Sequence, residues 1–179
     1  IALRLVGSEM CIRDSSTAKA GDLLILTRPI GSGVIMAADM AGQANGWDVA
    51  AALNIMGQAQ DVEAAILAPV ANAMTDVTGF GLAGHVHAIC KSSQLDANLW
   101  QDTIPVYAGA RNLSLAGVSS VLMPSNREDT PVKGIEDELL YDPQTAGGLL
   151  AAVPKEFSNT VIDKLALKGC VGYIIGSLT

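Results

Sequence analysis

The sequence lacks an apolar run long enough to cross a membrane. Half of its 179 residues are hydrophobic and the mean hydropathy is +0.36, but Gly, Pro, Asp or Asn interrupts every apolar stretch. None reaches the roughly 18 residues that a membrane-spanning helix needs. The sequence therefore predicts no association with a membrane. The surplus of apolar surface favours a domain that packs against another domain or subunit.

Basic residues are few and scattered. The chain has 11 Lys and Arg residues against 18 Asp and Glu residues, which gives a formal net charge of −7 and an isoelectric point near 4.6. An acidic surface without basic clusters repels a phosphate backbone, so we expect no nucleic-acid partner. A nucleotide ligand remains compatible with this charge, because a divalent cation can lie between carboxylate and phosphate.

Cysteines are also few, and neither they nor the histidines form a metal-binding pattern. Cys11, Cys90 and Cys170 are odd in number, far apart and without CxxC spacing, which predicts reduced thiols in a cytoplasmic protein. His85 and His87 stand two residues apart, roughly 200° around a helix, and cannot chelate one ion together. We expect His85 to contact the loop before its helix, His87 to lie at the surface and Cys90 to be a core thiol.

The first 15 residues share no pattern with the rest of the chain. The string LVGSEMCIRDS within them resembles a translated adapter sequence, and the chain begins with Ile. We interpret residues 1–15 as a non-native leader that replaces the natural N-terminus; a native but poorly patterned segment is the alternative. Residues 16–179 are long enough to bury one core, which predicts a single domain.

Strands and helices alternate from residue 20 onward. This pattern predicts an α/β fold, an α+β sandwich in which helices cover a mixed sheet. The expected strands are 23–27, 95–100, 149–153 and 171–175. The expected helices are 34–44, 49–56 with Asp48 as its cap, 61–67, 81–91, 106–115 and 154–168, while 75–81 and 117–137 are expected to be loops.

One segment, MTDVTGFGLAGH at 74–85, combines residue types that suit phosphate chemistry. Asp76 stands between the hydroxyls of Thr75 and Thr78, and two glycines follow before an expected helix. Backbone N–H groups at a helix N-terminus beside a Gly-rich loop bind anions. A carboxylate beside bound phosphate requires a cation between them, so this arrangement favours Mg²⁺ held in part by Asp76.

The residues alone leave a simpler interpretation open. Asp76 could be an Asx-turn or capping residue, and the two glycines could serve only the turn. The segment matches neither the P-loop nor the dinucleotide-binding fingerprint.

Three longer motifs resemble one known family. TDVTGFGLAGH at 75–85 resembles the signature of the selenophosphate synthetase C-terminal domain. LLYDPQTAGGLL at 139–150 is similar to that family's LLxDPQTSGGLL, and AGDLLILTRPIGSGV at 20–34 to its GDxLILTKPLGTG. The motifs occur in the family's order and the resemblance covers residues 18–179. The departures are Arg28 in place of the usual Lys, Ser32 in place of Thr, Ala146 in place of Ser and Ala83 in place of a common Leu.

The resemblance implies a fold, a reaction and a site. The fold would be a PurM-like C-terminal domain that packs against an N-terminal ATP-binding domain, and the complete protein would be a homodimer. The reaction would convert ATP, selenide and water into selenophosphate, AMP and phosphate, with Mg²⁺ and usually K⁺. Asp76 would be a Mg²⁺ ligand, and Thr75, Thr78, Gly79 and Gly81 would line the phosphate end of the nucleotide.

No catalytic residue is expected in this half. In the family the reactive Cys or selenocysteine, its Lys and further Mg²⁺ carboxylates lie in the N-terminal half, so this chain alone should be inactive. Two alternatives remain: another PurM-like synthetase or kinase, or a stand-alone, non-catalytic binding or scaffold domain. Residues 142–145 fit a structural turn and a substrate-facing loop equally well, and Asn126 and Arg127 are weaker candidates for the site.

Overall fold

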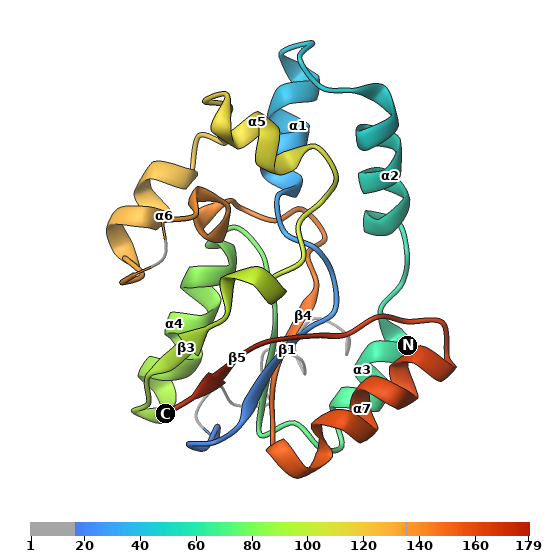
Figure 1. Cartoon of the computed structure of the whole chain (residues 1–179), viewed down its shortest axis with the longest axis vertical. Helices are drawn as coiled ribbons and strands as arrows, with labels where there is room; N and C mark the ends of the chain where they lie inside the picture. Colours follow the sequence, from blue (N-terminus) through green and yellow to red (C-terminus); the bar gives the residue numbers. More distant parts are fainter. Residues whose placement is uncertain (1–16, 135) are drawn as a thin grey trace, which may run out of the picture.

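A five-stranded sheet with helices on both faces forms the centre of the computed structural model (Figure 1), which describes residues 17–134 and 136–179. The interpretation of residues 1–15 lies outside the described residues. From one edge to the other, the strands are β2 (Ala73–Asp76), β4 (Leu149–Val153), β1 (Leu23–Leu26), β5 (Tyr173–Leu178) and β3 (Ala97–Leu99). Within the described ranges, no helix is long and apolar enough to cross a membrane.

The α/β fold class is confirmed, but the expectation of a mixed sheet is wrong. Each of the four neighbouring strand pairs is antiparallel. All five residues of β4 are buried, so this strand reads as a continuous apolar run. Such a run indicates that both faces of a sheet are covered, whichever direction the neighbouring strands take.

Alternating side chains of the strands enter two separate cores. On β1, Leu24 and Leu26 pack in the larger cluster and Ile25 packs in the smaller one. Leu149 and Leu150 divide in the same way on β4. This period of two is what a strand requires when both of its faces are buried.

The helices divide between the two faces and one end of the sheet. In Figure 1, α3 and α7 lie side by side at the lower right and pack over the smaller core, while α1, α2 and α5 gather at the upper end. The α-helices are α1 (Ser32–Met40), α2 (Gly46–Met56), α3 (Asp61–Leu67), α4 (Gly81–Ser93), α5 (Ala110–Leu115), α6 (Met123–Asp129) and α7 (Lys155–Leu167). Two short 3₁₀ helices are η2 (Gln101–Thr103) and η3 (Glu138–Tyr141).

Local signals located most elements, and the differences are informative. The helix 61–67 and the strand 149–153 have the expected bounds. Asn45, not Asp48, caps α2, because its side chain accepts a hydrogen bond from the Trp47 N–H at 2.9 Å. Helix α6 lies in a segment expected to be irregular; Pro124 occupies its first turn, where a missing N–H is harmless.

Candidate functional site

The candidate site begins where edge strand β2 ends. Thr75 and Asp76 pair with Leu150 and Leu149 of β4, so both belong to the sheet and not to the expected loop. The Thr75 hydroxyl donates to the Asp76 carbonyl at 3.2 Å. The loop itself comprises residues 77–80, and α4 starts immediately after it. Asp76 is therefore placed by the rigid sheet at the entrance to the loop.

Neighbouring segments hold the loop on two sides. The Val77 N–H donates to the Gly148 carbonyl at 2.9 Å, and the Gln144 N–H donates to the Thr78 carbonyl at 3.0 Å. On the helix side, the Thr78 N–H donates to Nε2 of His85 at 3.0 Å. The expected contact between His85 and the loop is thus confirmed.

Burial keeps His85 in the state that this contact requires. Desolvation lowers the pKa of the His85 imidazole, and the nearby Asp76 carboxylate opposes that shift. A neutral ring leaves Nε2 free to accept the Thr78 N–H, whereas a protonated ring could not accept it. His87 is exposed and Cys90 is buried, as expected; burial raises the pKa of the Cys90 thiol.

Gly81 fits its position for two reasons. Its φ is +70°, in the left-handed region that glycine favours, and a Cβ there would lie 2.8 Å from the Leu140 carbonyl oxygen. The start of α4 therefore rests directly on the backbone of η3. Gly79 has open space around it, so its role is not steric.

Asp76 and the loop backbone present groups without partners. Within the described residues, the Asp76 carboxylate accepts no hydrogen bond and forms no ion pair, although the side chain is half-buried. Within the described residues, the backbone N–H groups of Gly79 and Phe80 donate no hydrogen bond. No group of three His, Cys, Asp or Glu residues that could hold a metal occurs in the part of the chain that the structure describes. An unpaired carboxylate is the kind of oxygen donor that Mg²⁺ accepts.

Asp142 and Gln144 of the 142–148 loop are buried and hold it to the start of α1, whereas Thr145 and Ala146 are exposed. The Asp142 carboxylate accepts the Gly33 N–H at 2.9 Å, at the start of α1. Gln144 Oε1 accepts the N–H groups of Gly31 and Ser32 at 3.1 and 3.2 Å. Because Gln144 also binds Thr78, this loop joins the start of α1 to the candidate site.

Among the described residues, no cation forms an ion pair with the buried Asp142. Its side chain is fully inaccessible, and one carboxylate oxygen, Oδ1, has no hydrogen-bond partner. Burial raises the pKa of Asp142 to about 6, against the lowering effect of hydrogen bonds from Val34, Gln144 and Gly33. The proton bound at low pH therefore stabilises the folded state.

We predict that Asp142→Asn alters how stability depends on pH. A pKa raised from 3.8 to about 6 corresponds to a stabilisation of about 3 kcal/mol, present below pH 3.8 and lost as the pH rises through 6. The uncharged side chain of the Asp142→Asn variant does not lose stability in this way as the pH rises. Urea unfolding at pH 4.5 and 7.5 should show the variant gaining about 2 kcal/mol relative to the wild type at the higher pH. A pH-independent difference would contradict the assignment.

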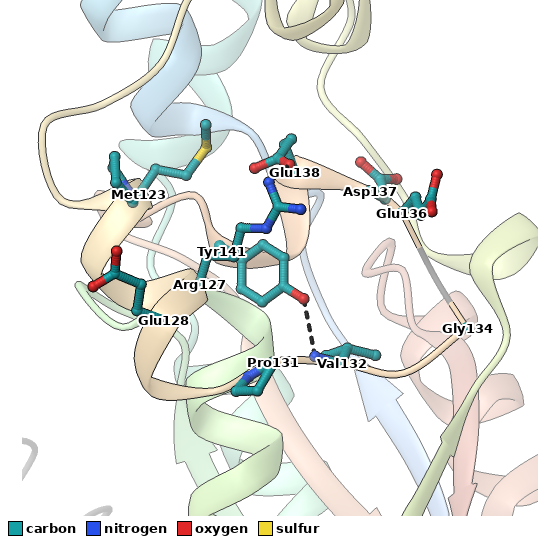
Figure 2. Close-up of a pocket in the computed structure, with 11 residues that line it drawn as sticks. Met123, Arg127, Glu128, Pro131, Val132, Gly134, Glu136, Asp137, Glu138 and Tyr141 are labelled. Atoms are coloured by element: carbon teal, nitrogen blue, oxygen red, sulfur yellow. Dashed lines mark hydrogen bonds and ion pairs between the residues drawn. The ribbon is translucent and has the colours of Figure 1, made fainter.

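A hollow of about 850 Å³ is formed by α6, η3 and residues 131–134 and 136–137 (Figure 2). Arg127 pairs with Glu138 at its wall, and the Tyr141 hydroxyl accepts the Val132 N–H at 3.0 Å. None of the predicted site residues lines it. Arg127 is therefore separate from the candidate site, whereas its neighbour Asn126 contacts the loop at Gly79.

Known proteins resemble the chain over almost its whole length. A family model for the C-terminal domain of AIR synthase related proteins matches residues 19–179. The selenide, water dikinase of Shewanella baltica is 38% identical over 174 residues, which are 93% of this chain and 49% of that protein. The chain thus spans about half the length of the curated relatives that it matches.

Solved structures with lower identity share the fold. The thiamine-monophosphate kinase of Stenotrophomonas maltophilia has a TM-score of 0.68 and 15% identity over 92% of this chain and 49% of that one. The hydrogenase maturation protein HypE in complex with ATP has a TM-score of 0.60 and 18% identity over 92% and 44%. Together with the family match, these likenesses identify a PurM-like fold. The chain belongs to the family of AIR synthase related proteins, and residues 19–179 correspond to the C-terminal domain of that family.

Proposed function

We propose that this chain is the C-terminal half of a selenide, water dikinase, which converts ATP, selenide and water into selenophosphate, AMP and phosphate. The observation that carries the proposal is the position of Asp76. Its carboxylate is partly exposed and unpaired at the end of an edge strand, beside two N–H groups without partners. The curated relatives that match almost the whole of this chain share that enzyme name.

In this proposal the chain positions phosphate and contributes no nucleophile. Asp76 is one Mg²⁺ ligand, and the ion neutralises phosphate charge when it is bound. The N–H groups of Gly79 and Phe80 donate to phosphate oxygens, Thr78 holds the loop to His85, and Gly81 lets α4 start at the loop. Hydrogen bonds that fix the loop before substrate arrives reduce the reorganisation needed during the reaction. K⁺ is a further expected ion, without an assigned residue.

The remaining partners are proposed from the half of the relatives that this chain does not cover. A domain with one carboxylate ligand needs an N-terminal domain to complete the metal set, and we propose that this domain also forms the homodimer. Three large apolar side chains near the loop and α6 are exposed and support a docking surface: Phe80, Val121 and Leu122. The free thiols of Cys90 and Cys170 suit a cytoplasmic location. The start of the domain at residue 16 also remains a proposal.

The substrate distinguishes the proposed enzyme from other PurM-like enzymes. We predict that the complete two-domain protein forms selenophosphate from ATP and selenide and does not phosphorylate thiamine monophosphate. The chain of 179 residues alone should form no selenophosphate, because Asp76 cannot hold the metal by itself. Phosphorus NMR of the products measures both. Product from the isolated chain, or phosphorylation of thiamine monophosphate by the complete protein, would contradict the proposal.

A further inference from the structure

Asn126 links the candidate site to a helix that the sequence motifs do not include. It lies on α6 and is only 7% exposed. Its side-chain amide donates to the Gly79 carbonyl at 2.8 Å and to the Tyr141 carbonyl at 2.9 Å. Both amide hydrogens are therefore used, one on the loop and one on η3.

The bond to the Gly79 carbonyl determines the direction of the next N–H group. The Gly79 carbonyl and the Phe80 N–H belong to one planar, trans peptide unit, so they point in opposite directions. With the carbonyl held against α6, the Phe80 N–H points away from α6. Gly79 has open space around it, and glycine permits many backbone conformations. Without Asn126 this peptide unit could rotate.

The preceding peptide unit is held in the same way. The Thr78 carbonyl accepts the N–H groups of Gln144 at 3.0 Å and Gly81 at 3.1 Å. The Gly79 N–H, in the same peptide unit, therefore points away from those donors. Two consecutive N–H groups without partners are thus fixed by two carbonyls that are each bound by a neighbouring segment.

We infer that Asn126 is a positioning residue that aims the Phe80 N–H at a nucleotide phosphate. The inference rests on the proposed function, because the phosphate is the substrate that the loop would bind. Asn126 does not touch the substrate; it acts through the 79–80 peptide unit. An Asp at position 126 has the same size but cannot donate to two carbonyl oxygens when ionised.

The test compares Asn126→Asp with the control Ser125→Ala in the complete two-domain enzyme. The Ser125 hydroxyl is exposed and donates only to Leu122 within its own helix region. We expect Asn126→Asp to raise the KM for ATP about tenfold and to leave the KM for selenide unchanged, since a hydrogen bond to a charged phosphate is lost. The control should change neither. An unchanged KM for ATP, or an equal rise in both, would overturn the inference.

A second measurement separates this inference from the proposed function and needs no variant. Nitrogen-15 relaxation of the wild-type chain reports the rigidity of the Gly79 and Phe80 N–H groups. We expect order parameters of about 0.85, typical of a rigid backbone. Values below about 0.6 would show that the peptide unit moves freely and would overturn the role of Asn126. Rigid N–H groups in a protein whose complete form makes no selenophosphate would refute the proposed function instead.

Discussion

Asp76→Asn should abolish selenophosphate formation by the complete enzyme and leave its fold intact. The loss should be at least a factor of about 100, because removing even outer partners of metal ligands costs 10–100-fold. The melting temperature should stay within a few degrees, since the Asp76 carboxylate forms no hydrogen bond or ion pair within the described residues. Phosphorus NMR and thermal unfolding measure the two effects.

The matched control for this variant is Asp163→Asn. Asp163 is exposed on α7, on the opposite face of the sheet from α4, and carries the same charge. The Asp163→Asn variant should retain full activity. A second readout concerns His85, whose pKa the Asp76 carboxylate raises. Asp76→Asn should therefore lower the pKa of His85, measured by NMR titration. Full activity of the Asp76 variant would refute the metal-ligand assignment.

Gly147→Ala should destabilise the domain. A Cβ at this position would overlap the Val77 carbonyl oxygen and lie 2.8 Å from the Cβ of Gln144. Overpacking of this kind costs about 1–3 kcal/mol, occasionally more. For a chain of this length, each kcal/mol lowers the melting temperature by about 2–4 °C, so we expect a decrease of about 5–10 °C.

The control for the glycine replacement is Gly46→Ala. Gly46 is the first residue of α2, and a Cβ there would meet no atom within 4 Å. Alanine favours helix, so the melting temperature should stay the same or rise slightly. Equal melting temperatures for the two variants would contradict the close packing of the 142–148 loop against Val77.

The sequence predicted the elements with strong local signals. Helix 61–67 was bounded correctly because Asp61 and Pro69 mark its ends, and strand 149–153 because its apolar run is continuous. The direction of the strands could not be predicted, since pairing joins residues far apart, as Leu23 with Val153. Antiparallel pairing emerges only when the chain is folded.

The residues of the candidate site also divide into those that the sequence predicted and those that it did not. Asp76 and the glycines were recognised from one continuous motif, and the structure places them at the end of β2 and the start of α4. The roles of Asn126 and Gln144 were not predicted, because each contacts the loop from a separate segment, 47 residues from Gly79 for Asn126. The sequence named Asn126 as a weaker candidate for the site, but the irregular pattern around it concealed the helix that positions it.

We propose that this domain works with an ATP-binding half in one polypeptide. The most direct measurement is to sequence the source locus upstream of the codon for Ser16. We expect an in-frame, Gly-rich domain with clustered Asp residues and a Cys codon or in-frame UGA. A genuine start codon near residue 1, with the first 15 residues intact, would contradict the account and favour a stand-alone binding or scaffold domain.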